Sequence, residues 1–223
     1  MRVYDRLWFS SYNRLKCAII PPVLVILEVG MILSSRFEEA LLFATRLHST
    51  QWRKGTGIPY IAHLLAVTSI VLENGGNEDE AIAALLHDAI EDQGGDATRE
   101  EIRRRFGNDV VAIVDGCTDA DVIPKPPWRA RKESYIAHLR QAPPPVRLVS
   151  SADKLHNARA LLADYRQLGD ELWLRFQGGK GGTLWYYRAV VDVLSEGGSN
   201  PLIEELERVV AELEHLAGNT ASK

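Results

Sequence analysis

Apolar residues recur every three or four positions along most of the chain after residue 34. This spacing is typical of amphipathic helices, in which one face turns towards a hydrophobic core. The pattern predicts helices over residues 37–44, 61–72, 81–87, 102–106, 109–117, 148–162, 183–195 and 202–216. No stretch alternates apolar and polar residues in the manner of a β-strand, and the chain has no internal repeat. We therefore expect an all-α fold.

Start signals define where several of these helices begin. A hydroxyl or amide residue followed three positions later by glutamate forms a capping box, which satisfies free N–H groups at a helix N-terminus. The pattern occurs at Ser35/Glu38, Asn77/Glu80 and Thr98/Glu101. The run Pro143–Pro145 introduces the long helix around 148–162, because proline fits the first helical turn. The intervening segments, which are candidate site loops, are 50–59, 92–97, 118–127 and 177–182.

The composition indicates a globular protein, with 46% hydrophobic and 25% charged residues. The formal net charge of −4 has the wrong sign for a chain that binds a nucleic acid polymer through its phosphates. The two cysteines, Cys17 and Cys117, cannot build a disulfide framework or a cysteine-based zinc site, so a reducing cytoplasm is the simplest setting. Any metal ion must then be held by histidine and carboxylate side chains.

Residues 1–33 do not share the pattern of the rest of the chain. The charge-free run 17–27 follows several arginines, as in a signal sequence, but it is interrupted by two prolines and is too short to span a bilayer. We predict a domain over residues 34–217, a flexible tail at 218–223, no membrane span, and a doubtful N-terminal extension at 1–33. Its origin stays open between a mis-assigned start with Met31 as initiator, a loosely packed extension, and membrane targeting.

Four side chains with the chemistry of metal ligands fall on predicted helices: His63, His87, Asp88 and Asp153. A mixed set of imidazole and carboxylate donors suits a borderline divalent ion such as Mn²⁺, Fe²⁺ or Zn²⁺. Such a set leaves coordination positions open for water and substrate, and the ion makes hydroxide available near neutral pH. The sequence therefore predicts a catalytic metal site.

Two further carboxylates follow the central pair of this set. Glu91 lies four residues after His87, and Asp92 lies four residues after Asp88. Residues this far apart share one face of a helix, directly after the apolar run 81–86. Placing four polar groups in a core helix is costly unless they have a function, which makes the carboxylates candidates for catalysis.

The sequence HDAIED at residues 87–92 resembles the H-D-x-x-E-D signature of the RelA/SpoT-type alarmone hydrolases, which are HD-domain metal-dependent phosphohydrolases. Three other segments resemble motifs of the same family: QWRKG…PYIAH at 51–63, DGCT at 115–118 and ADKLHN at 152–157. The resemblance covers residues 35–195. It implies an all-α HD-domain helical bundle and a stand-alone hydrolase.

The resemblance also implies residue roles. It assigns four metal ligands, which are His63, His87, Asp88 and Asp153, with Mn²⁺ as the usual ion and Fe²⁺, Co²⁺ or Zn²⁺ as alternatives. Glu91 and Asp92 match the carboxylates that orient and activate the attacking water. The implied substrate contacts are Arg53, Lys54, Lys154 and Asn157. Among these, Arg53 matches the residue that packs on the purine, where a planar guanidinium supplies stacking and charge.

The leading hypothesis is removal of the 3′-diphosphate from guanosine tetra- or pentaphosphate, which gives GDP or GTP and pyrophosphate. Two features depart from the family pattern: the interval from Arg53 to His63 is longer by one residue, and Ala160 stands where a threonine is common. They leave open a phosphatase for another 2′- or 3′-phosphorylated nucleotide, such as NADPH. A non-catalytic HD module that binds an alarmone or a partner is the third hypothesis. The expected partner is a small phosphorylated nucleotide, and a homo-oligomer is compatible with the sequence.

Overall fold

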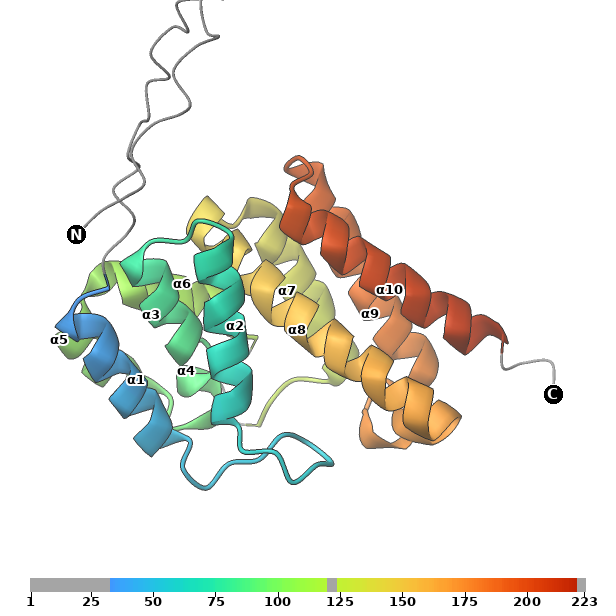
Figure 1. Ribbon diagram of the computed structural model, residues 1–223, viewed down its shortest axis with the longest axis horizontal. Helices are drawn as coiled ribbons and strands as arrows, with labels where there is room; N and C mark the ends of the chain where they lie inside the picture. The colour runs from blue at the N-terminus through green and yellow to red at the C-terminus, as the bar shows by residue number, and fades with distance from the viewer. Residues whose placement is uncertain (1–32, 120–123, 220–223) are drawn as a thin grey trace, which may run out of the picture. The chain divides into compact units, whose positions relative to one another are not determined.

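A computed structural model describes residues 33–119 and 124–219, and every regular element within them is a helix (Figure 1). The elements are α1 (Ser35–Leu47), α2 (Ile61–Glu73), α3 (Glu78–Leu86), α4 (Ala89–Asp92), α5 (Asp96–Phe106), α6 (Asn108–Cys117), α7 (Trp128–Gln141), α8 (Pro144–Leu168), the 3₁₀ helix η1 (Gly169–Arg175), α9 (Gly179–Glu196) and α10 (Pro201–Asn219). The all-α prediction is confirmed. Almost all of the predicted extension, and most of the predicted tail, lie outside the described residues.

The start of α3 forms as predicted. The side chain of Asn77 accepts a 3.0 Å hydrogen bond from the backbone N–H of Glu80, and the Glu80 carboxylate accepts a 2.6 Å bond from the backbone N–H of Asn77. This reciprocal capping box fixes the first turn of a helix whose residues 81–86 are all buried. A rigid and buried α3 therefore delivers His87 and Asp88 at its C-terminal end.

The other two capping predictions are wrong in position. Ser34, and not Ser35, caps α1, because its hydroxyl accepts from the backbone N–H of Arg36. Helix α5 begins before Thr98, at Asp96, so the threonine lies within the first turn. Its buried hydroxyl donates back to the carbonyl of Gln93 instead of capping the helix.

The hydrophobic pattern predicts neither α7 nor η1, and it places a loop at 177–182 where α9 begins at Gly179. Helix α7 buries only Tyr135 and Leu139 within its own span, so its apolar periodicity is weak. This helix has no continuous apolar face. It is supported by helix propensity and by packing against α9.

Helix α8 connects the parts of the bundle. It packs against α2, α3, α6, α9 and α10, while α2 and α3 also pack against each other. Leu64, Leu85 and Ala152 come from these three neighbouring helices α2, α3 and α8, and all are fully buried. The packing of α2, α3 and α8 therefore brings together chain segments that are far apart in the sequence. None of the helices in the described part of the chain is long and apolar enough to cross a membrane.

Candidate active site

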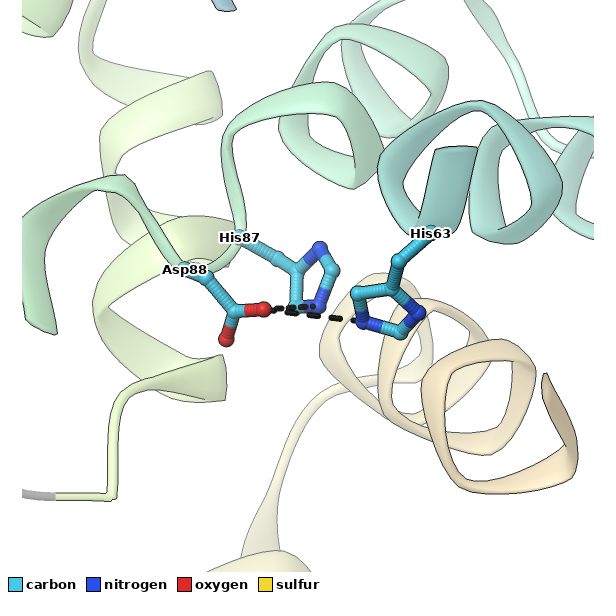
Figure 2. A group of neighbouring side chains, drawn as sticks. All are labelled: His63, His87 and Asp88. Carbon is cyan, nitrogen blue, oxygen red and sulfur yellow. Dashed lines mark ion pairs between the residues drawn. The ribbon is translucent and has the colours of Figure 1, made fainter. Parts of the chain in front are cut away.

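The four predicted metal ligands meet where α2, α3 and α8 pack together. Oδ2 of Asp88 lies 3.0 Å from Nε2 of His87 and 3.6 Å from Nε2 of His63 (Figure 2). Oδ1 of Asp153 lies 3.2 Å from Nε2 of His63 and 3.6 Å from Nε2 of His87. His63, His87 and Asp88 thus form a group that could hold a metal ion, and Asp153 approaches both of its imidazole nitrogens. This donor set suits a borderline divalent ion.

The prediction that His87 and Asp88 lie within one helix is wrong, because the pair lies at a break between two helices. His87 follows the end of α3, and Asp88 precedes α4, which is a single turn. Nδ1 of His87 lies 2.8 Å from the carbonyl oxygen of Ala84 and must donate to it, because a carbonyl only accepts. In the neutral ring Nε2 then carries a lone pair. It is buried and has no hydrogen-bond partner among the described residues, which fits a metal ligand.

A second histidine orients His63. Nδ1 of His63 lies 2.7 Å from Nδ1 of His156. Burial, together with the nearby His63 and Arg53, lowers the pKa of His156 to about 4, so this ring is neutral at pH 7. A proton on Nδ1 of His63, donated to His156, leaves Nε2 of His63 free to bind a metal ion.

Hydrogen bonds also hold both ligand carboxylates. The hydroxyl of Tyr60 donates to Oδ2 of Asp88 at 2.6 Å. On α8, Asn157 donates to Oδ1 of Asp153 and Lys154 donates to its Oδ2, each at 2.5 Å. Burial opposes the charge of Asp153, but Lys154 and the facing histidines hold the pKa of this carboxyl well below its usual range. Both aspartates are therefore present as anions that can bind a cation.

The two candidate catalytic carboxylates lie beside this centre in different surroundings. Oε1 of Glu91 accepts a 2.6 Å bond from Lys125, and Oε2 accepts from the backbone N–H of Asp119 at 3.2 Å. Oδ2 of Asp92 accepts a 2.7 Å bond from the amide of Gln51. Both oxygens of Glu91 are thus occupied, while Oδ1 of Asp92 has no hydrogen bond within the described residues.

Asp92 also titrates differently from an ordinary aspartate. Desolvation in the pocket and the charge of Asp88 raise its pKa, although the hydrogen bond from Gln51 opposes the shift. A carboxylate with a raised pKa is a stronger proton acceptor, which suits general-base catalysis near neutral pH.

These groups open into a pocket of about 420 Å³. Its polar lining contains Arg53, Lys54, Asp88, Glu91, Asp92, Lys132, Asp153, Lys154 and Asn157. Its aromatic lining contains Tyr60, Trp128, Phe176, Tyr186 and Tyr187. All four predicted substrate contacts and both predicted catalytic carboxylates therefore line one cavity. Cationic and aromatic side chains beside a candidate metal centre are suited to a small phosphorylated ring compound.

The predicted purine contact is held in place by two neighbours. The guanidinium of Arg53 donates to Oδ1 of Asn157 at 2.8 Å and lies 5.9 Å from the ring centroid of Tyr60. The ammonium of Lys54 lies 5.7 Å from the ring centroid of Phe176. Residues 55–58, which lie in the interval that is longer by one residue, form a turn closed by the bond from the backbone N–H of Arg53 to the carbonyl of Ile58. The turn keeps Arg53 directed at the pocket.

The basic segment 125–132 is occupied by internal contacts. Besides the pairing of Lys125 with Glu91, both Arg131 and Lys132 donate to Oδ2 of Asp119. The sequence pattern does not predict these ion pairs, because each pair depends on how the start of α7 folds against the pocket. The sequence also predicts no role for Tyr60 or Gln51, although both residues lie inside the motif at 51–63.

Together, the helical bundle and its buried histidine–aspartate centre define a metal-site protein of the HD type. A family model described as "HD domain" matches residues 40–181. The chain belongs to the HD-domain family, and this prediction is confirmed.

Several curated relatives share one name. The guanosine-3′,5′-bis(diphosphate) 3′-pyrophosphohydrolase MESH1 of Xenopus tropicalis is 42% identical over 126 residues, which is 55% of this chain and 68% of that protein. The human protein of the same name is 39% identical over 126 residues, which is again 55% of this chain and 68% of that protein. The guanosine-3′,5′-bis(diphosphate) 3′-pyrophosphohydrolase of Aquifex aeolicus is 37% identical over 57% of this chain, but the match covers only 18% of that protein.

A solved structure gives the same picture at the level of the fold. It is described as a metazoan ortholog of SpoT that hydrolyses ppGpp, and it superposes with a TM-score of 0.66 at 28% identity. The match covers 84% of this chain and 98% of the other. The fold of this chain is therefore that of an HD-domain bundle over nearly the whole length of that neighbour.

Proposed function

We propose that this protein is a metal-dependent pyrophosphohydrolase that removes the 3′-diphosphate of guanosine tetra- or pentaphosphate. Water attacks the phosphorus that is bonded to the 3′-oxygen, and the bond between that oxygen and phosphorus breaks. The 3′-oxygen leaves as a hydroxyl after taking up a proton, which gives GDP or GTP and pyrophosphate. The observation that carries the proposal is the convergence of His63, His87, Asp88 and Asp153 beside Glu91 and Asp92, next to a pocket that is also lined by Arg53, Lys54 and Lys154. The names of the relatives agree with this substrate.

The four ligands would hold one divalent ion, for which we propose Mn²⁺. When bound, this ion supplies a Lewis acid that activates water and offsets charge on phosphorus. Asp92 would take the proton of the attacking water through its unoccupied oxygen. Glu91, held by Lys125 and Asp119, would orient the same water.

Substrate contacts come from the other side of the pocket. Arg53 would stack on the purine, and Lys54 would bind phosphate. Asn157 and Lys154 touch Asp153, so a substrate held by them would be positioned directly against the metal centre. Their contact with substrate stays a prediction, as does the assignment of residues 34–217 as the hydrolase domain.

Three further parts of the proposal concern the setting of the enzyme. We propose that the protein is cytoplasmic, because a chain with two cysteines is suited to a reducing compartment. We propose a small nucleotide as the substrate and not a nucleic acid polymer, because the pocket volume is about 420 Å³ and the net charge is −4. A homo-oligomer stays compatible with both.

The test is product analysis on a panel of nucleotides. Purified protein is incubated with Mn²⁺ and guanosine tetraphosphate, guanosine pentaphosphate or NADPH, and the products are separated by ion-exchange chromatography. Pyrophosphate with GDP or GTP supports the proposal. Orthophosphate from NADPH alone assigns the phosphatase instead, and tight binding without turnover assigns a non-catalytic module.

A further inference from the structure

Gln51 connects the catalytic region to a buried histidine. Its amide nitrogen donates to Oδ2 of Asp92 at 2.7 Å. Its amide oxygen lies 2.6 Å from Nδ1 of His48 and accepts a 2.6 Å bond from the amide of Gln93. One side chain therefore bridges the base of the loop 50–59 and the end of α4.

The charge of Asp92 determines which way this amide faces. An ionised carboxylate only accepts hydrogen bonds, so the NH₂ group of Gln51 must point to Asp92. The carbonyl oxygen of Gln51 must then point to His48 and Gln93, and both of these groups must donate. A reversed amide would place its oxygen against the carboxylate, which is repulsive.

His48 is suited to this fixed role. Its side chain is 2% exposed and stacks on Tyr60, with ring centroids 5.4 Å apart. Burial lowers its pKa, so the ring is neutral and carries a single N–H. That N–H must be on Nδ1, because only then can the amide oxygen of Gln51 accept a hydrogen bond from it. Nε2 is then a buried acceptor without a partner among the described residues.

The bond to Gln51 also determines which oxygen of Asp92 is available. Oδ2 is occupied by the amide, whereas Oδ1 has no hydrogen bond within residues 33–119 and 124–219. A carboxylate fixed at one oxygen presents the other in a constant direction. This arrangement suits a group that must accept a proton from a water molecule at a defined position.

Resting on the proposed function, we propose that Gln51 is a positioning residue for Asp92 and that the Nδ1–H of His48 sets its orientation. The backbone of Gln51 is held separately, by bonds from its N–H to the carbonyl of His48 and from the N–H of Tyr60 to its own carbonyl. Changing the Gln51 side chain therefore removes the bond to Asp92 without opening the base of the loop.

The first test compares Gln51→Leu with Gln51→Glu. Leucine removes the donor to Asp92 in every protonation state. Glutamate keeps the size and shape of the side chain and removes the donor when it is ionised. Steady-state kinetics with Mn²⁺ and guanosine tetraphosphate should show kcat lower by about 10- to 100-fold in both variants. KM and bound Mn²⁺ per chain should stay near the wild-type values. Gln167→Leu, on the exposed surface of α8, is the matched control and should retain kcat. Wild-type kcat in Gln51→Leu would overturn the proposal.

The second test separates the two properties of His48. His48→Asn retains an N–H donor near the position of Nδ1 and loses the aromatic ring, whereas His48→Phe retains a ring and loses the donor. We expect His48→Asn to keep kcat within about threefold and His48→Phe to lose about 10-fold or more. The reverse order would show that stacking on Tyr60 is the role of this residue.

A third measurement does not depend on turnover. In a crystal structure of Gln51→Leu, the Asp92 carboxylate should leave the orientation that it has beside Gln51. An unchanged carboxylate would overturn the positioning role even if every variant were inactive. Failure of the wild-type protein to release pyrophosphate, in contrast, would contradict only the proposed substrate.

Discussion

The hydroxyl of Tyr60 donates a 2.6 Å hydrogen bond to Oδ2 of Asp88, the same oxygen that faces Nε2 of His63 and His87. Burial and the charge of Asp88 raise the pKa of Tyr60, so the hydroxyl stays protonated and always donates. The bond fixes the direction in which this carboxylate presents its oxygen to a metal ion.

Tyr60→Phe should therefore weaken metal binding by about 10- to 100-fold, because it frees a ligand carboxylate to rotate. The ring that stacks on His48 is retained, so the fold should persist. The measurement is a Mn²⁺ titration against a chelating dye. Tyr165→Phe, which deletes a hydroxyl bonded to Asp170 elsewhere, is the control and should leave affinity unchanged. Equal affinities in the two variants would contradict the role of Tyr60.

Two other variants should distinguish the loss of metal binding from the loss of catalysis. Asp88→Ala removes a ligand and should abolish Mn²⁺ binding, as measured by metal content after gel filtration. Glu91→Gln should retain the metal and reduce kcat by about 10²-fold or more, because an amide no longer assists the attacking water as a carboxylate does. Activity retained in both variants would refute the assignment of the site.

The sequence was sufficient to predict the helical class and to choose the residues that meet in the centre. His63, His87, Asp88 and Asp153 were predicted from donor chemistry and motif resemblance, and the packing of α2, α3 and α8 brings them together. Local rules also predicted the capping box of Asn77, since both of its hydrogen bonds lie within one turn.

The contacts around the centre were beyond such local rules. Lys125 and Glu91 are 34 positions apart, and Arg53 and Asn157 are 104 positions apart. These pairs depend on how the loops meet the bundle, which no periodicity encodes. The misplaced cap at Thr98 has a similar cause, because its burial and its bond to Gln93 are tertiary features.

Cys117 should be nearly inert at physiological pH. Burial raises the pKa of its thiol to about 11, so only about one thousandth is thiolate at pH 8. Alkylation by iodoacetamide, followed by mass spectrometry of the peptide containing Cys117, should accelerate about tenfold for each pH unit below 11. In guanidinium chloride the pKa returns to about 8.5, and the reaction at pH 8 should be at least 10²-fold faster than in the folded protein. Equal rates would show an exposed thiol.

The aromatic wall of the pocket should depend on a glycine. A Cβ atom on Gly178 would lie 2.6 Å from Cη2 of Trp128, whereas one on Gly181 would meet no atom within 4 Å. Gly178→Ala should therefore displace Trp128, which lines the pocket, and lower the free energy of unfolding by about 1–3 kcal/mol.

Urea unfolding and steady-state kinetics together test this dependence. Gly178→Ala should lower the unfolding midpoint and raise KM, because the shifted indole changes the shape of the cavity. Gly178 is the N-cap of α9, whereas Gly181 lies in open space within the first turn of that helix. Gly181→Ala should therefore keep KM and raise stability by up to about 1 kcal/mol through better helix propensity. Both variants add one methyl group near the start of α9, so a difference in KM between them reports the contact with Trp128. If Gly178→Ala proved as stable as Gly181→Ala, with an unchanged KM, then Trp128 would not be held in the pocket wall by its close contact with Gly178.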